Sequence, residues 1–264
     1  LEAITRGAGP MNSPLGPRGN AGVFGGVNES LRKKGIPPVA AAYGSAGVRV
    51  YASCSLLPCG PLLACTFDQE LVETVARHTA QEMRTRGVQV LLAPGMNLHR
   101  NPLCGRNFEY FSEDPLVSGL MAAAITRGVQ KHPGRGVTIK HFAANNQEYN
   151  RYNNNSLVSQ RALREIYLKG FGLCIRESQP CAVMTSYNLI NGVHTSESRE
   201  LTQDILRCEF GFRGIVMTDW VVGGSMLYNS KKHPMPNAGK VAAAGGDLFM
   251  PGCQGDYNLS LINL

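Results

Sequence analysis

Four short apolar runs along the chain each stop abruptly at polar residues that are capable of catalysis. The runs cover residues 90–93, 137–139, 182–185 and 215–218, and the residues just after them include Asn97, Lys140, His141, Ser186, Tyr187, Asn188, Asp219 and Trp220. Short apolar runs of this kind are typical of buried strands. In a barrel of parallel strands the carboxyl ends meet at one face, where enzymes of that architecture hold their active sites. The pattern therefore predicts a single shared site.

Helical patterns alternate with these strands. The first has apolar residues at 71, 72, 75, 76 and 83, begins at the candidate N-cap Asp68 and ends near Gly87. A second begins at Pro115, a third is capped by Ser159, and a shorter fourth covers residues 201–208. This alternation predicts a parallel sheet with helices outside it. We expect an α/β fold, a (β/α)8-type (TIM-like) barrel.

The barrel is expected to be irregular near its N-terminus or incomplete. Only about five strands are clear, counting a last strand-like run at residues 247–250. Glycine and proline interrupt every period over residues 1–34, which we interpret as an irregular N-terminal segment. Residues 35–264 are expected to form the barrel domain. The length of 264 residues and the hydrophobic content of 43 % suit one barrel or most of one.

Charge and hydropathy do not indicate a nucleic-acid or membrane protein. The formal net charge is +7, but the densest basic groups, residues 32–34 and 231–233, are short and far apart in sequence. Solvated surface charge is the better interpretation. No apolar run approaches the roughly 18 residues of a membrane span, and no basic segment followed by an apolar one opens the chain. A cleaved signal peptide leaves no trace, so a cytoplasmic and a secreted location both stay open.

The eight cysteines form no Cys-x-x-Cys pair, and several lie in apolar or helical context. They are Cys54, Cys59, Cys65, Cys104, Cys174, Cys181, Cys208 and Cys253. We expect buried thiols in a reducing compartment rather than a disulfide framework.

Four longer motifs resemble the N-terminal catalytic barrel of glycoside hydrolase family 3. They are residues 104–115 (CGRNFEYFSEDP), 140–148 (KHFAANNQE), 184–188 (MTSYN) and 214–220 (GIVMTDW), in the family's order. The resemblance covers roughly residues 35–252 and is greatest to the β-glucosidase branch. It implies a retaining β-glycosidase that acts on a terminal non-reducing β-D-glucosyl residue and needs no metal or organic cofactor.

Asp219 is the candidate nucleophile. Retaining glycosidases use one carboxylate to attack the anomeric carbon and a second, roughly 5–5.5 Å away, to protonate the leaving oxygen. Asp219 follows a strand, precedes an aromatic ring and falls on the family's (S/T)-D-W position. The alternative is an aspartate that caps the next helix, which is common after a strand.

Three cationic residues match the family's contacts to sugar hydroxyls: Arg106, Lys140 and His141. Fixed donors suit a neutral, polyhydroxylated ligand because each can serve two oxygens. The alternative for Arg106 is a structural ion pair with Glu109 or Glu113. For the Lys140-His141 pair it is packing and backbone hydrogen bonding at the strand end.

The resemblance assigns further walls of the sugar site. Tyr187 matches a tyrosine near the nucleophile, Trp220 a sugar-stacking platform, and Met184 a flanking wall. Tyr187 could instead be a core residue whose hydroxyl meets the backbone. In the loop after residues 140–141, Arg151 is an equal candidate for binding or structure, whereas Glu148 is expected to tie down its own loop.

Tyr43 is the main departure from the family pattern. Family members carry D-G-P-x-G-(V/L)-R near the first strand, where the aspartate accepts hydrogen bonds from distal sugar hydroxyls; residues 43–49 read YGSAGVR. A hydrogen bond to a charged group contributes about 1.5–3 kcal/mol, so its loss weakens sugar binding. Tyr43 also adds bulk at the sugar's far edge. Residues 52–58 and Val221-Val222 depart as well.

No general acid/base can be assigned within these residues. In the β-glucosidase branch it comes from a separate α/β-sandwich domain after the barrel, so we expect a separate or missing C-terminal domain to supply it. The family's N-acetylhexosaminidases use a histidine in the loop after K-H, and residues 143–147 hold none.

Two functions of different classes therefore stay open. One is a β-glucosidase that uses Asp219, and the other is a catalytically degenerate barrel that only binds carbohydrate. A third, an unrelated barrel for phosphorylated ligands, lacks a glycine-rich loop opening a late helix.

Overall fold

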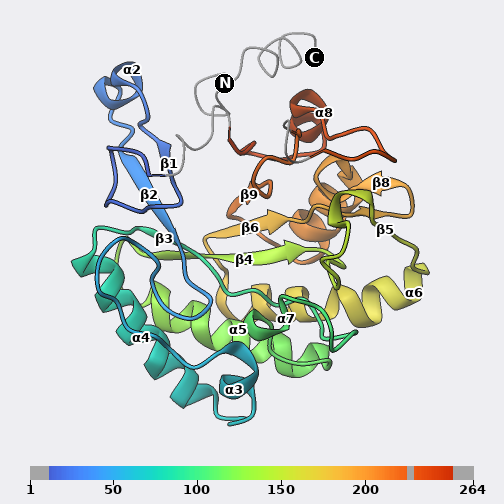
Figure 1. The fold of residues 1–264 in the computed structure, drawn as a ribbon, viewed down its shortest axis with the longest axis horizontal. Coiled ribbons are helices and arrows are strands. Elements are labelled where there is room, and N and C mark those ends of the chain that lie inside the picture. Colours follow the sequence, from blue (N-terminus) through green and yellow to red (C-terminus); the bar gives the residue numbers. More distant parts are fainter. Residues whose placement is uncertain (1–11, 225–228, 252–264) are drawn as a thin grey trace.

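A curled, mostly parallel sheet forms the centre of the molecule (Figure 1). The computed structural model describes residues 12–224 and 229–251. The order of the six strands is β1 (Gly22–Gly25), β2 (Pro38–Tyr43), β3 (Val90–Leu92), β4 (Gly136–Phe142), β6 (Ala182–Thr185) and β9 (Ile215–Met217). Only β1 runs antiparallel to its neighbour. Leu248 extends the sheet past β9 through one parallel bridge to Met217.

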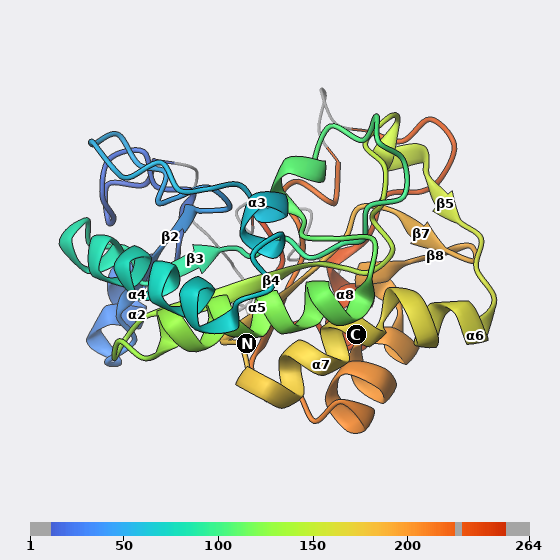
Figure 2. The same cartoon turned by 90° about the horizontal axis from the view of Figure 1, so that it is seen from below.

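Helices cover the outer face of this sheet. Figure 2 shows α4 (Gln69–Thr85), α5 (Pro115–Gln130) and α7 (Lys169–Ser178) along one side of it. The remaining α-helices are short: α2 (Glu29–Lys33), α3 (Gly60–Ala64), α6 (Gln160–Ala162) and α8 (Ala238–Ala243). The π-helical segments are η3 (Leu163–Tyr167) and η5 (Glu200–Glu209), and the 3₁₀ turns are η1 (Asn107–Glu109), η2 (Arg151–Asn153) and η4 (Thr195–Glu197).

The helix starts follow from local capping. Asp68 accepts hydrogen bonds from the backbone N–H groups of Glu70 and Leu71 at 2.9 and 3.0 Å, and Ser159 accepts one from Ala162 at 3.2 Å. Each cap satisfies amide groups that have no partner within the helix. Both predicted N-caps are confirmed.

Apolar side chains are buried on both faces of the sheet. Between sheet and helices lies a large cluster that includes Met83, Ile139 and Phe171. Inside the curl lies a smaller one that includes Met184 and Leu248. Burial on both faces explains why the strands read as continuous apolar runs in the sequence.

The predicted incomplete α/β barrel is confirmed, and two details differ from expectation. The expectation of an irregular segment over residues 1–34 is wrong for part of it, because β1 pairs with residues 38–41 and Asn28 caps α2 through the Leu31 N–H at 2.9 Å. The sheet therefore includes residues before 35. The run at 247–250 makes a single bridge rather than a full strand.

The described cysteines are free thiols, but most are not buried. Cys174 is buried, whereas Cys65 and Cys208 are exposed and four others are intermediate. The expectation of buried thiols is therefore wrong for most of them, because they lie in loops or on outer helix faces; Cys253 lies outside the described residues. Within the described ranges no helix is both long and apolar enough to cross a membrane.

A small second sheet joins the loops beyond the carboxyl ends of β4 and β6. Its order is β5 (Asn155–Ser156), β7 (Leu189–Ile190) and β8 (Val193–His194). Because β5 pairs with β7, the loop after β4 is tied to the loop after β6. This pairing fixes the positions of Arg151 and Tyr187 relative to each other.

Candidate active site

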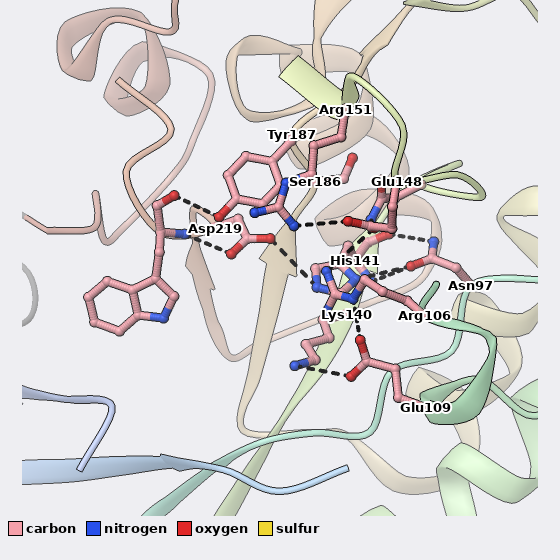
Figure 3. A network of polar contacts seen from close by, with 12 residues as sticks. Asn97, Arg106, Glu109, Lys140, His141, Glu148, Arg151, Ser186, Tyr187 and Asp219 are labelled. Carbon is pink, nitrogen blue, oxygen red and sulfur yellow. Dashed lines mark hydrogen bonds and ion pairs between the residues drawn. The ribbon is translucent and has the colours of Figure 1, made fainter. Parts of the chain in front are cut away.

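The carboxyl ends of three neighbouring strands bring the polar side chains together (Figure 3). Lys140 and His141 lie within the last residues of β4, Tyr187 follows β6, and Asp219 follows β9. Loops after β3 and β4 add Arg106 and Arg151. The structure thus places these six side chains, predicted from separate motifs, in one polar network.

Asp219 is buried and only half satisfied by hydrogen bonds. Its side chain accepts one bond at Oδ1, from the Trp220 N–H at 2.7 Å. Oδ2 has no hydrogen-bond partner among the described residues and lies 3.6 Å from His141 Nε2. Burial raises the pKa of Asp219, while Arg106, the Trp220 N–H, Lys140 and Arg151 oppose that rise. The capping alternative finds no support in the described residues, where the next helix, α8, begins only at Ala238 with Asn237 as its cap.

His141 is oriented by Asn97. The Asn97 amide donates to the His141 carbonyl at 2.8 Å, and its Oδ1 accepts the His141 backbone N–H at 2.9 Å. This pair directs Oδ1 at the ring, so Nδ1–H donates to it at 3.2 Å, closer than the Tyr110 hydroxyl at 3.5 Å. Burial holds the pKa of His141 well below its usual value.

It follows that the neutral imidazole directs an acceptor, Nε2, at the free carboxylate oxygen of Asp219. Two acceptors that face each other at 3.6 Å lack the proton they would share. A hydroxyl group of a ligand supplies such a proton. The pair is therefore suited to a hydroxyl group placed directly beside the candidate nucleophile.

Glu109 links two of the cationic residues. Lys140 Nζ lies 3.6 Å from its Oε2, Arg106 Nε donates to its Oε1, and the Ser45 hydroxyl donates to Oε2 at 2.5 Å. Burial alone would raise the pKa of Glu109, but Lys140, Arg106 and Ser45 together hold it below the usual carboxyl value. The predicted alternative of an Arg106–Glu109 ion pair is therefore present. Sequence reasoning identified Glu109 only as that partner and missed its contacts to Lys140 and Ser45, although it lies in the 104–115 motif.

Arg151 lies over Tyr187. Its guanidinium carbon is 4.1 Å from the centroid of the Tyr187 ring, and Nη1 donates to Glu148 Oε2 at 3.0 Å. Arg106 Nη1 lies 3.8 Å from the other oxygen of Glu148. Glu148 thus bridges two arginines and ties down its loop, as expected. The Tyr187 hydroxyl donates to the Trp220 carbonyl at 2.7 Å.

The network balances its own charge. Three cations, Arg106, Lys140 and Arg151, stand against three carboxylates, Glu109, Glu148 and ionised Asp219. Fixed donors and acceptors in a neutral arrangement fit a polyhydroxylated neutral molecule. Within the described residues no group of His, Cys, Asp and Glu side chains could hold a metal ion.

Two predicted wall residues lie in the apolar interior instead. Met184 is 1 % exposed and Trp220 is 8 % exposed, and both pack with Met217 and Leu248 inside the curl. Met184 alternates along β6 with Val183, which faces the helices. Their side chains belong to the apolar cluster against which Tyr43 packs, next to the polar network. The apolar inside of the incomplete barrel, which needs covering, accounts for their direction.

Tyr43 ends β2 beside Lys140. Its ring centroid is 5.7 Å from Lys140 Nζ and 5.9 Å from the guanidinium carbon of Arg49. Burial, with a further contribution from the Asp219 charge, raises the pKa of Tyr43 to about 12, so the phenol stays neutral. The tyrosine therefore lies at the edge of the site, as its place in the sequence predicts.

Replacement of Glu109 by Gln should destabilise the protein strongly. Glutamine leaves Lys140, which is 3 % exposed, and Arg106 without their shared counter-charge, and breaking such a buried pair costs about 3–5 kcal/mol. Because the pKa of Glu109 is lowered, its contribution is present above the usual carboxyl pKa and is lost as the pH falls through the lowered value. Urea unfolding at several pH values measures the free energy of unfolding of the parent chain and the variant. The exposed Glu113→Gln is the control, and equal stability of both variants at neutral pH would contradict the assignment.

Comparison with known proteins identifies the family. A model described as the glycosyl hydrolase family 3 N terminal domain matches residues 22–259. The chain belongs to glycoside hydrolase family 3. A β-glucosidase from Ruminococcus albus is 48 % identical to this family 3 chain over 222 residues, which is 83 % of the chain and 23 % of that protein. β-Glucosidase B from Emericella nidulans is 45 % identical over 227 residues, 83 % of the chain and 25 % of that protein.

Solved family 3 relatives share the barrel fold. β-Glucosidase 3B from Thermotoga neapolitana, in complex with α-D-glucose, aligns with a TM-score of 0.87 and 37 % identity over 99 % of this chain and 37 % of that one. A β-glucosidase from Paenibacillus barengoltzii gives a TM-score of 0.87 and 44 % identity over 94 % of this chain and 27 % of that one. The chain spans about a quarter of the length of the curated relatives it matches.

Proposed function

We propose that this barrel binds the glycone of a β-glucoside and supplies the nucleophile of a retaining β-glucosidase. The observation that carries the proposal is the free Oδ2 of Asp219, buried among three cations and facing the bare Nε2 of His141. The glucosyl preference rests on the relatives, which are named β-glucosidases.

The geometry supports a double displacement. Oδ2 of Asp219 attacks the anomeric carbon and forms the covalent glycosyl-enzyme, which water then hydrolyses. Oδ1 keeps its bond to the Trp220 N–H, so the carboxylate stays oriented through the step. A glycone hydroxyl next to the anomeric carbon donates to Nε2 of His141. Arg106, Lys140 and Arg151 donate to other hydroxyls and oppose the rise in the pKa of Asp219 that burial causes.

The protonating carboxyl group is proposed to come from the C-terminal sandwich domain that the resemblance implies. Glu148 and Glu197 are the two carboxylates of this chain to compare with such an acid. Glu148 accepts from Arg151 at 3.0 Å, and its other oxygen lies 3.8 Å from Arg106, so both oxygens are engaged within the site. Glu197 accepts the Asn237 backbone N–H at 2.7 Å just before α8 and serves that loop. Neither arrangement supports proton donation to a leaving group.

Titration calorimetry with glucose and glucono-δ-lactone distinguishes this enzyme from a degenerate carbohydrate-binding barrel. The lactone has the flattened ring of the oxocarbenium-like transition state. A site built for catalysis should bind it at least about 100-fold more tightly than glucose, as transition-state analogues do. Equal affinities would favour the binding-only barrel, and no affinity for either sugar would contradict both functions.

As the pH is lowered, the rate of cleavage of an activated glucoside should begin to fall at a higher pH than it would if the nucleophile had the usual pKa of a carboxyl group. Asp219 must be ionised to attack, and burial raises its pKa. The rate should therefore fall as the pH drops through this raised value, above the usual carboxyl range. Arg106→Gln removes the first of the cations that oppose the rise, so its acid limb should move to still higher pH. Initial rates with 2,4-dinitrophenyl β-D-glucoside over a range of pH measure this acid-side fall. If the fall occurs at the same pH in Arg106→Gln, Arg106 does not influence the pKa of Asp219 and the prediction is contradicted.

A further inference from the structure

A cavity of about 580 Å³ extends from the active site past Tyr43. Lys140, Arg106 and Glu109 line it on the side of the site, and Arg49 lines it with the loop of residues 43–50. Asp219 is not among its lining residues. Its volume lies within the roughly 300–1,000 Å³ of small-molecule sites. The cavity therefore provides room beyond the part of a glycone that meets Asp219.

The charge of this cavity is unbalanced, in contrast to the network around Asp219. Three cations line it, Arg49, Arg106 and Lys140, against one carboxylate, Glu109. Glu109 is already engaged by Lys140, Arg106 and Ser45. Arg49 is exposed, and among the described residues no carboxylate lies within ion-pair distance of it. Of the two excess positive charges, that of Arg106 also faces Glu148 outside the cavity at 3.8 Å, so Arg49 carries the one that has no carboxylate partner among the described residues.

The backbone holds Arg49 beside Tyr43. Its N–H donates to the Tyr43 carbonyl at 2.9 Å, and the two residues form an antiparallel bridge. Its guanidinium carbon lies 5.9 Å from the Tyr43 ring centroid, opposite a phenol that stays neutral and can donate a hydrogen bond. An aspartate in place of Tyr43 would add the negative charge that this wall lacks.

We propose that the cavity receives an anionic group on C6 of the glycone, a carboxylate or a phosphate, held by Arg49 with the Tyr43 hydroxyl and Lys140. The inference rests on the proposed function, because Asp219 fixes the anomeric carbon at one end and directs the opposite edge of the sugar towards Tyr43. Guanidinium groups bind both anions through paired N–H donors. Among sugars of the gluco configuration, the preferred substrate is then one whose C6 carries the anion, a β-glucuronoside or a 6-phospho-β-glucoside, rather than the neutral β-glucoside.

Titration of the chain with three methyl β-glycosides tests this preference. They are the glucoside, the glucuronide and the glucoside 6-phosphate. At low salt at least one anionic glycoside should bind about tenfold or more tightly than the glucoside, and the advantage should shrink at high salt because exposed charges are screened. The larger of the two gains identifies the anion. If the glucoside binds as well as both others, the anion site is overturned and the glucosidase stands; if none binds, the proposed function fails with it.

Two variants and a control test whether the preference for anionic glycosides depends on Arg49 and Tyr43. Arg49→Gln should bring the anionic and neutral glycosides to within about twofold of each other. Arg18→Gln removes another exposed arginine, 6.0 Å from the Tyr51 ring centroid and not among the lining residues, and should preserve the preference. Tyr43→Asp should reverse it, with the glucoside about tenfold tighter and the anionic sugars weaker. An unchanged preference in Arg49→Gln would overturn the proposal.

Discussion

Asparagine in place of Asp219 should lower cleavage of 2,4-dinitrophenyl β-D-glucoside by about 10⁴-fold or more, because it removes the attacking charge while keeping the shape. The fold should survive the change. The pKa of Asp219 is raised, so its ionised form costs stability above that pKa, and the neutral amide does not carry this cost. We therefore expect an unchanged or higher melting temperature. Initial rates and thermal unfolding measure the two effects separately.

A matched control separates chemistry from general damage. Asp204 is exposed on η5, away from the network, and Asp204→Asn should change neither quantity. Undiminished turnover by Asp219→Asn would exclude the double displacement at this residue. A large loss of stability would show instead that the carboxylate holds Arg106, Lys140 and Arg151 in place.

The rate of this chain should depend steeply on the leaving group. A general acid contributes about 10²–10⁴-fold, and none is in position among the described residues. Dinitrophenolate departs with little protonation, so its glucoside should be cleaved slowly, whereas cellobiose should be left almost untouched. Azide should accelerate the second step by attacking the glycosyl-enzyme. Two displacements restore the original configuration, so the product should be the β-glucosyl azide.

Glu148→Gln and Glu197→Gln test the two carboxylates that could still act as the acid. Both variants should keep the same preference for dinitrophenolate over cellobiose, because Glu148 binds arginines and Glu197 binds the Asn237 N–H. Cellobiose hydrolysis by the parent chain at a rate similar to that of the activated glucoside would require an acid/base within these residues. Loss of that hydrolysis in one variant would then identify it.

Features set by neighbouring residues were predictable from the sequence. The strands at 90–92, 182–185 and 215–217 follow from short apolar runs, as does the first half of the strand at 136–142, which continues through Lys140 and His141; the helix starts follow from Asp68 and Ser159. The shared site follows from parallel topology, because the parallel strands β2, β3, β4, β6 and β9 all have their carboxyl ends at one face.

Features set by distant contacts were not predictable. The sequence of β1 begins and ends with glycine and shows no strand pattern, and its pairing with β2 depends on the tertiary structure. Asn97 fixes the His141 ring across 44 positions of sequence, so the bare Nε2 cannot be inferred from either motif alone. The inward direction of Met184 and Trp220 likewise depends on an apolar interior formed by several strands.

Covalent trapping tests the central claim most directly. 2,4-Dinitrophenyl 2-deoxy-2-fluoro-β-D-glucoside carries a leaving group that needs no acid, and its fluorine slows breakdown of the glycosyl-enzyme. Intact-mass analysis of the chain should show one added fluoroglucosyl group, and peptide mapping should locate it on Asp219, with no label in Asp219→Asn. A label on Glu109, Glu148 or another carboxylate, or an unlabelled protein that still binds gluconolactone, would contradict the assignment of Asp219 as the nucleophile.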